Sequence, residues 1–238
     1  MMRMSRNFWW AMASAVLCFA PCALGQVNIT LTSAGNNVMD GVYVGPYNAT
    51  VNGTATQIIC DDFVDESYVG ESWTANVTTL SNLNGTKWGG MAGATTLYDE
   101  AAWLATQMLS PTYSGNTTQV GYLAYALWAV FQPAAVENWL GANSTTWLAV
   151  QAWLNSAGAQ HFTPGEFANF FLYTPNLNYP ISCNGGPCPS GPPQEFFGFI
   201  STPDGGSTLM YILISLLACL GAIWFRSRRQ IEARVTAV

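Results

Sequence analysis

The sequence VNITLT at residues 27–32 alternates apolar and polar side chains, whereas TLYDEAAWLATQM at residues 96–108 repeats its apolar side chains at helical spacing. A period of two indicates a strand with one buried face. In the second segment, one helix face collects Leu97, Ala101, Leu104 and Met108. A β-rich part followed by helices, instead of regular alternation of the two, predicts an α+β domain.

The β-rich part is expected to continue to residue 80. Residues 42–44, 56–60 and 68–80 have the composition of further strands, and Asn52-Gly53 is a hairpin signal between two of them. Because hairpins join antiparallel strands, we predict an antiparallel sheet.

A cluster of about three helices is expected after the strands. The first begins at Thr96, where Asp99 completes an acidic form of the capping box. The second begins at residue 117 or 118, with a threonine hydroxyl as its cap, and ends before Pro133. The third runs from residue 143 or 144 to Gly158. Four tryptophans on these helices are expected to pack in the core rather than form a carbohydrate platform: Trp103, Trp128, Trp147 and Trp153.

Charge is distributed unevenly along the chain. Between residues 26 and 203 Lys87 is the only Lys or Arg, whereas all but two of the thirteen Asp and Glu residues lie there. An acidic domain of this kind repels nucleic acid and anionic lipid head groups, so neither is an expected ligand. The apolar content, 50% of the chain, suffices for the packed core of a single domain.

Both ends of the chain carry signals for export or membrane insertion. Residues 1–25 have the pattern of a signal peptide, with Arg3 and Arg6, an apolar stretch, and Ala23-Leu24-Gly25 as a cleavage site. Residues 209–225 form an apolar run at the short end of what a bilayer-spanning helix requires, and the basic residues after it predict a cytoplasmic C-terminus. The predicted organisation is a signal peptide (1–25), an extracytoplasmic α+β domain (26–173), a Pro/Gly-rich linker (174–201) and a tail (202–238). Residues 195–200 are expected to form either one last strand or an extended connector to the tail.

The tail resembles a PEP-CTERM-type sorting tail in its Pro-Asp-Gly variant. The resemblance rests on a polar motif, an apolar helix and a basic stop, namely Thr202, Pro203, Asp204, Gly205, Gly206 and Ser207, residues 209–225, and Arg226, Arg228 and Arg229. It implies that an exosortase-like enzyme cleaves near the proline and delivers the upstream domain to the cell envelope or matrix. Thr202 stands where many relatives have Val, and Asp204 where the commonest form has Glu. The alternative is an ordinary single-pass anchor without processing.

Three cysteines fall in the predicted outer domain and linker. Cys183 and Cys188 enclose four residues, so a local disulfide between them is geometrically easy in an oxidising compartment. Cys60 is then unpaired, and we expect it to be a buried strand residue.

A second resemblance concerns Cys60. The segments ICDDF at 59–63 and LAYALW at 123–128 are similar to those of bacterial surface thioester domains, in which a Cys condenses with a helix Gln and the thioester captures amines. Cys60 matches that Cys and Trp128 the helix Trp, but Ala124 occupies the Gln position. The resemblance therefore implies a related fold with a vestigial thioester position, because no carboxamide is there to react. Gln119 lies on a different helical face and is a poor substitute.

The densest acidic cluster comprises Asp61, Asp62, Asp65, Glu66 and Glu71. We interpret it as a solvated acidic turn. Calcium binding stays open as an alternative, since oxygen-rich loops bind Ca²⁺, but the spacing fits no EF-hand loop. We predict no metal and no cofactor.

The sequence contains no recognisable catalytic motif. His161 is the only histidine, and the chain has no G-x-S-x-G, phosphate-binding Gly loop, HExxH or CxxC motif. A pair of glycosidase carboxylates stays open, because two acids can meet from any distance in sequence. We therefore expect a protein without catalytic activity of its own.

The expected function is that of an exported cell-envelope or matrix protein, processed by an exosortase-like enzyme and structural or adhesive in an exopolysaccharide matrix. Its precursor would be a single-pass inner-membrane protein. Two alternatives are an adhesin of thioester-domain descent and a plain single-pass membrane-anchored carbohydrate-binding domain.

Overall fold

The computed structural model of the chain describes residues 25–183, 188 and 191–199. All of these except Phe199 belong to the first of two compact units, Met1–Gly198. The predicted signal peptide up to residue 24 and the whole predicted sorting tail, 202–238, lie outside the described residues. Within the described ranges, no helix is both long and apolar enough to cross a membrane.

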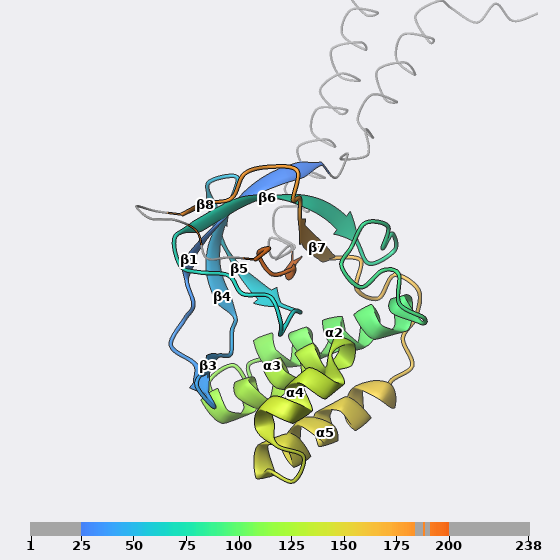
Figure 1. The fold of residues 1–238 in the computed structure, drawn as a ribbon. Coiled ribbons are helices and arrows are strands. Elements are labelled where there is room, and N and C mark those ends of the chain that lie inside the picture. The colour runs from blue at the N-terminus through green and yellow to red at the C-terminus, as the bar shows by residue number, and fades with distance from the viewer. Residues whose placement is uncertain (1–24, 184–187, 189–190, 200–238) are drawn as a thin grey trace, which may run out of the picture. The chain divides into compact units, whose positions relative to one another are not determined.

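A seven-stranded sheet forms one half of the domain (Figure 1). Its strand order is β1-β4-β5-β9-β7-β6-β8, and β1 also pairs with β6, so the sheet closes into a barrel. At the closure Thr30 lies opposite Thr50 on one side and Ser72 on the other. The strands are β1 (Gln26–Ser33), β4 (Tyr47–Val51), β5 (Thr54–Cys60), β6 (Glu71–Thr79), β7 (Phe170–Pro175), β8 (Ser182–Cys183) and β9 (Phe196–Phe199).

Several strand predictions are confirmed. In β1, Ile29 and Leu31 are buried and their neighbours point outward. The hairpin between β4 and β5 turns at Asn52 and Gly53. Their φ values of 49° and 80° are both positive, as a two-residue type I′ turn requires. A separate small hairpin pairs β2 (Val38–Met39) with β3 (Val42–Tyr43).

In the described part of the chain, four helices pack together beside the barrel, where a cluster of about three was predicted (Figure 1). They are α2 (Ala94–Leu109), α3 (Thr117–Phe131), α4 (Pro133–Leu140) and α5 (Thr145–Gly158). Helix α3 is the central one, because it contacts α2, α4 and α5 and is buried along most of its length. The predicted α+β class is therefore confirmed, with a closed barrel as its β part.

The helix starts differ in part from the prediction. Helix α2 begins at Ala94 after Gly93, without a side-chain cap, so the predicted capping box of Thr96 and Asp99 is wrong. The cap of α3 is the Asn116 side chain, which accepts a hydrogen bond from the Gln119 amide, and not a threonine hydroxyl. Helix α5 starts where predicted, and the Ser144 side chain caps it by accepting a hydrogen bond from the Trp147 amide at 3.0 Å.

The segment predicted as a linker, 174–201, contributes to the barrel. It holds the end of β7, all of β8 and all of β9, and β9 pairs with β5. Phe196 and Phe197 of β9 are fully buried. Burial of this aromatic pair outweighs the Pro/Gly-rich composition that suggested a spacer.

Of the four helix tryptophans predicted to pack in the core, two are buried there. Trp128 and Trp147 are buried. Trp103 and Trp153 are half-buried and pack on each other, with ring centroids 6.1 Å apart.

Candidate functional site

Three successive residues at the end of strand β5 are buried: Cys60, its last residue, and Asp61 and Asp62, which follow it. The Cys60 carbonyl accepts a hydrogen bond of 2.9 Å from the Trp128 indole of α3. The Cys60 thiol donates to the Asp62 carbonyl at 3.0 Å, which ties the strand end into a tight turn. The hydrogen bond to the central helix and the turn together place the Asp61 and Asp62 carboxyl groups at the end of the barrel next to the helices.

Glu195, one residue before β9, brings a third carboxyl to the same place. The Asp61 amide donates to the Glu195 carbonyl at 3.3 Å, continuing the β5–β9 pairing. The Glu195 side chain is fully buried and accepts from the Tyr98 hydroxyl at 2.5 Å, from the Lys87 amide at 2.9 Å, and from the Thr174 hydroxyl. Its carboxylate therefore has donors on both oxygens.

Asp61 is in the opposite situation. It is 0% exposed, and neither of its carboxyl oxygens receives a hydrogen bond from any residue that the structure describes. Burial, followed by the negative charge of Glu195, raises the pKa of Asp61 well above its usual range. A protonated Asp61 has a partner, because its O–H can donate to the Glu195 carboxylate. We therefore assign Asp61 as a neutral acid beside Glu195, whose two oxygens also accept hydrogen bonds from other donors.

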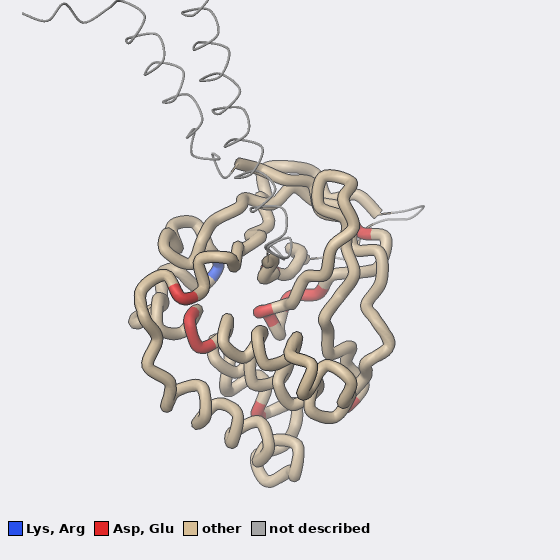
Figure 2. Tube along the Cα trace, turned by 180° about the vertical axis from the view of Figure 1, so that it is seen from behind, with Lys and Arg blue, Asp and Glu red and all other residues tan. Residues whose placement is uncertain are grey.

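Asp62 forms an ion pair with Lys87. Lys87 is the single Lys or Arg among the described residues, and it is drawn blue in Figure 2. It also forms an ion pair with Asp65, at 2.5 Å. Burial raises the pKa of Asp62, while Lys87 opposes the shift. Burial also lowers the pKa of Lys87, but the two carboxylates outweigh this effect and raise it.

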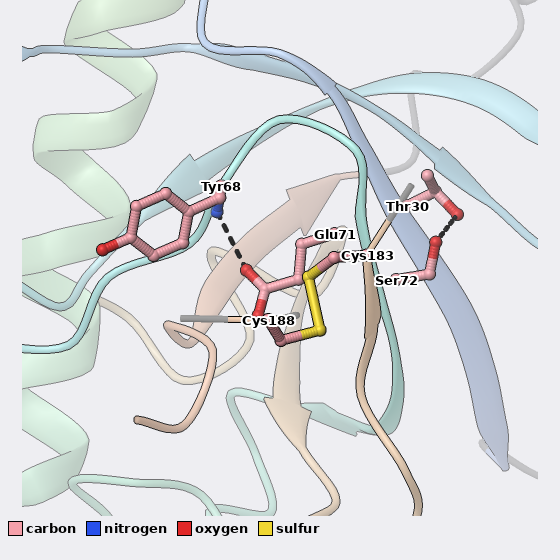
Figure 3. Close-up of a disulfide and its surroundings, with 6 residues drawn as sticks. All are labelled: Thr30, Tyr68, Glu71, Ser72, Cys183 and Cys188. Carbon is pink, nitrogen blue, oxygen red and sulfur yellow. Dashed lines mark hydrogen bonds between the residues drawn. A yellow bond between two sulfur atoms is a disulfide. The ribbon is translucent and has the colours of Figure 1, made fainter. Parts of the chain in front are cut away.

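Glu71, a fourth buried acid, lies apart from this group at the start of β6, next to the disulfide (Figure 3). It accepts a hydrogen bond of 2.9 Å from the Tyr68 amide, and burial raises the pKa of its carboxyl. Glu71 pairs with Cys183 of β8, and Cys183 forms the predicted disulfide with Cys188, with a Cα–Cα distance of 5.3 Å.

The predicted solvated acidic turn is therefore wrong for three of its five members. Asp61, Asp62 and Glu71 are buried, Asp65 is half-buried, and only Glu66 is exposed. Within the described ranges, no three His, Cys, Asp or Glu side chains come together as a metal site.

Sequence reasoning missed Glu195, Tyr98 and Thr174, which complete the buried cluster. The sequence does contain one indication for Glu195. It directly precedes a phenylalanine-rich strand, so it is expected to lie next to the core that the phenylalanines enter. Its partner could not be named, because the pairing of β9 with β5 joins distant parts of the chain.

The predicted vestigial thioester position lies at the same strand end. Cys60 is the free cysteine of the described part and is buried, as expected, and burial raises the pKa of its thiol. Ala124 is buried on α3, one turn before Trp128. Gln119 is engaged elsewhere, because its side-chain oxygen accepts from the Trp153 indole at 3.3 Å.

A surface pocket of about 460 Å³ lies between the loop after β6 and the start of α2. Its wall combines polar and apolar side chains, including Leu80, Ser81, Asn84, Met91 and Thr95. A neighbouring hollow of about 270 Å³ shares Leu80, Ser81 and Thr95 and adds Asp99. His161 is exposed and lines neither hollow. No family model matches the chain, and neither a curated protein nor a solved structure does.

Proposed function

We propose that this chain is an exported, non-enzymatic surface protein with a structural or adhesive role linked to exopolysaccharide, delivered to the cell envelope or matrix by an exosortase-like enzyme. The observation that carries the proposal is the order of the tail: Thr202-Pro203-Asp204-Gly205-Gly206-Ser207, an apolar run at 209–225, then Arg226, Arg228 and Arg229. The membrane partner in this proposal is that apolar run, inserted before cleavage.

The disulfide supports an extracytoplasmic location. Cys183 and Cys188 are joined in the structure, and disulfides persist in oxidising compartments and are rare in the cytosol. This bond lies upstream of the sorting motif, in the part of the chain that the proposal places outside the membrane.

The state of the acidic side chains supports a non-enzymatic role. A general acid or base must lie within hydrogen-bonding reach of its substrate. Asp61 and Glu195 are both 0% exposed, and the Glu195 carboxylate is hydrogen-bonded within the domain. The larger surface pocket is lined by hydroxyl, amide and apolar groups, with no titratable side chain. Such a lining suits the hydroxyl-rich, partly apolar surface of a sugar.

Sorting is tested in the native host with a C-terminal epitope after Val238. A Pro203→Ala/Asp204→Ala double variant changes the motif, and Pro189→Ala, in the same Pro-rich stretch but outside the motif, is the matched control. We expect the wild type and the control to lose the epitope and leave the membrane fraction, and the double variant to keep both tail and membrane association. Equal retention of the epitope in all three would overturn the sorting part and leave a single-pass anchor.

The polysaccharide part is tested separately, by cosedimentation with the host's own exopolysaccharide. Asn84→Ala removes one polar group of the pocket, and the loss of one hydrogen bond should weaken binding about five- to tenfold. Gln160→Ala, an exposed amide distant in sequence from the pocket residues, is the control. Binding by neither wild type nor variants would contradict this part alone.

One observation favours a second candidate, an adhesin of thioester-domain descent. The Trp128 indole bonds the Cys60 carbonyl, which holds the strand that ends in Cys60 against α3, the helix that carries Ala124. Incubation with methylamine distinguishes this candidate, because a covalent adduct would show as a mass increase. We expect no adduct, since the helix lacks the Gln.

A further inference from the structure

Lys87 is the only lysine in the whole chain, and its amine lies between two carboxylates. One of them, Asp62, is 0% exposed, while the Lys87 side chain is 26% exposed. The Lys87 ammonium also lies over the Trp88 ring, 5.0 Å from its centroid. The amine and the Asp62 carboxyl therefore meet in a site from which much of the water is excluded.

The two oxygens of the Asp62 carboxyl have different surroundings. Oδ2 contacts the Lys87 amine. Oδ1 accepts backbone N–H groups from Val64 at 3.2 Å and from Asp65 at 3.3 Å. Two backbone donors on one oxygen, with an amine at the other side of the same carboxyl, form the arrangement that stabilises a tetrahedral intermediate of acyl transfer.

We propose that Lys87 and Asp62 form an intramolecular amide bond, with Asp65 as the proton-transfer group. This inference does not depend on the proposed sorting of the chain. It assigns a covalent modification made by the protein itself, and it needs only residues that the structure brings into contact.

The atoms of the reaction balance without any other reactant. One proton of the Lys87 ammonium passes to Oδ2 of Asp62, which gives a neutral amine and a neutral acid. The amine nitrogen then attacks Cγ, and the negative charge that develops on Oδ1 is held by the Val64 and Asp65 amides. A second proton leaves the nitrogen for Asp65, whose carboxylate lies 2.5 Å from Nζ, and is passed on to Oδ2. The Cγ–Oδ2 bond breaks, one water leaves, and Asp65 returns to its ionised form.

Burial acts on this reaction in two ways. It raises the pKa of Asp62, which favours the neutral acid that the amine can attack. Burial also lowers the pKa of Lys87, but the two carboxylates outweigh this effect and raise it, so removal of the first proton from the ammonium is the demanding step. Asp65 acts after that step as the acceptor of the second proton, so its loss is expected to slow bond formation.

The bond would join the end of β5 to the loop between β6 and α2. These points are separated by 25 residues, and β6 lies between them. A covalent link across this segment would keep β6 attached to the barrel end when the domain is pulled, which suits a surface protein.

The test uses the full chain, purified, reduced and denatured. Because Lys87 is the only lysine, a lysine-specific protease cuts the denatured chain once if the amine is free and not at all if it is acylated. We expect resistance to this protease, no ε-amine labelling, and an intact mass lower than the sequence mass by one water. Complete cleavage together with the full mass would overturn the proposal and leave an ordinary ion pair.

Variants assign the partners. Asp62→Ala should restore cleavage after Lys87 and the full mass, and persistence of the cross-link in this variant would contradict the assignment to Asp62. Asp65→Asn should form the bond at least tenfold more slowly. The rate is followed in freshly synthesised, natively purified protein, as the fraction of chains that the lysine-specific protease still cuts at each time. Glu66→Gln, an exposed acid in the same loop, is the matched control and should cross-link like the wild type. The wild-type measurement decides the proposal even if a variant fails to fold.

Discussion

Asp61 offers the clearest prediction, because it is a carboxyl group without a hydrogen-bond donor in a fully buried position. Its pKa is raised in the folded state by burial first and by Glu195 second. The folded protein therefore holds a proton that the unfolded chain releases above about pH 4. Raising the pH from there toward the folded-state pKa must favour unfolding.

The magnitude follows from one proton. Within this window, which ends at the folded-state pKa, the free energy of unfolding falls by about 1.4 kcal/mol per pH unit through Asp61. Asp61→Asn is uncharged at every pH, and its amide can donate to Glu195 as the protonated acid does. The variant should therefore lose this dependence and be more stable than the wild type at pH 7.

The assay is urea unfolding of the full chain in detergent, followed by tryptophan fluorescence at pH 5, 6 and 7. The difference in free energy between Asp61→Asn and the wild type should grow with pH at about 1.4 kcal/mol per unit. Glu66→Gln removes an exposed carboxylate and controls for the loss of one negative charge. Parallel curves for Asp61→Asn and the wild type would refute the assignment of a protonated Asp61.

Three further changes test other parts of the fold. Trp128→Phe leaves the buried Cys60 carbonyl without its donor and should cost about 1–3 kcal/mol in urea unfolding; no loss would show that another donor replaces the indole. Cys188→Ser removes the disulfide, which closes a loop of sequence separation 5, and should lower the free energy of unfolding by about 2 kcal/mol. The wild type in reductant should lose the same amount, and a wild type whose stability does not change in reductant would contradict this prediction. Gly89→Ala places a Cβ 2.1 Å from the Leu83 carbonyl oxygen and should cost about 1–3 kcal/mol, whereas Gly90→Ala, with open space around it, should cost far less; equal effects would refute the close approach.

Local patterns in the sequence predicted the local structure well. The alternation around Ile29 and Leu31 and the Asn52-Gly53 turn depend on neighbouring residues only, and the structure bears both out. The same reasoning failed at Pro133, which was interpreted only as the end of a helix. Proline also suits the first turn of a helix, where its missing N–H is not needed, and α4 begins there.

The candidate site could be predicted only in part, because it depends on contacts between distant segments. The acids after Cys60 were recognised as a cluster, but their burial follows from the pairing of β5 with β9 and from the position of α3. The sequence leaves residues 195–200 open as a last strand or a connector, and the Pro/Gly-rich composition before Gln194 gives no sign that this strand pairs with β5 and brings in Glu195. Composition reports the flexibility of a free segment, and here the burial of Phe196 and Phe197 decides the outcome.

The central claim, that the chain is exported and then released from its tail, is tested most directly by the intact mass of the mature protein from its native host. The account predicts a chain that begins at Gln26 and ends near Pro203, with any excess mass reporting attached glycans. A mass that includes every residue to Val238 would contradict the sorting proposal and would indicate a membrane-anchored domain.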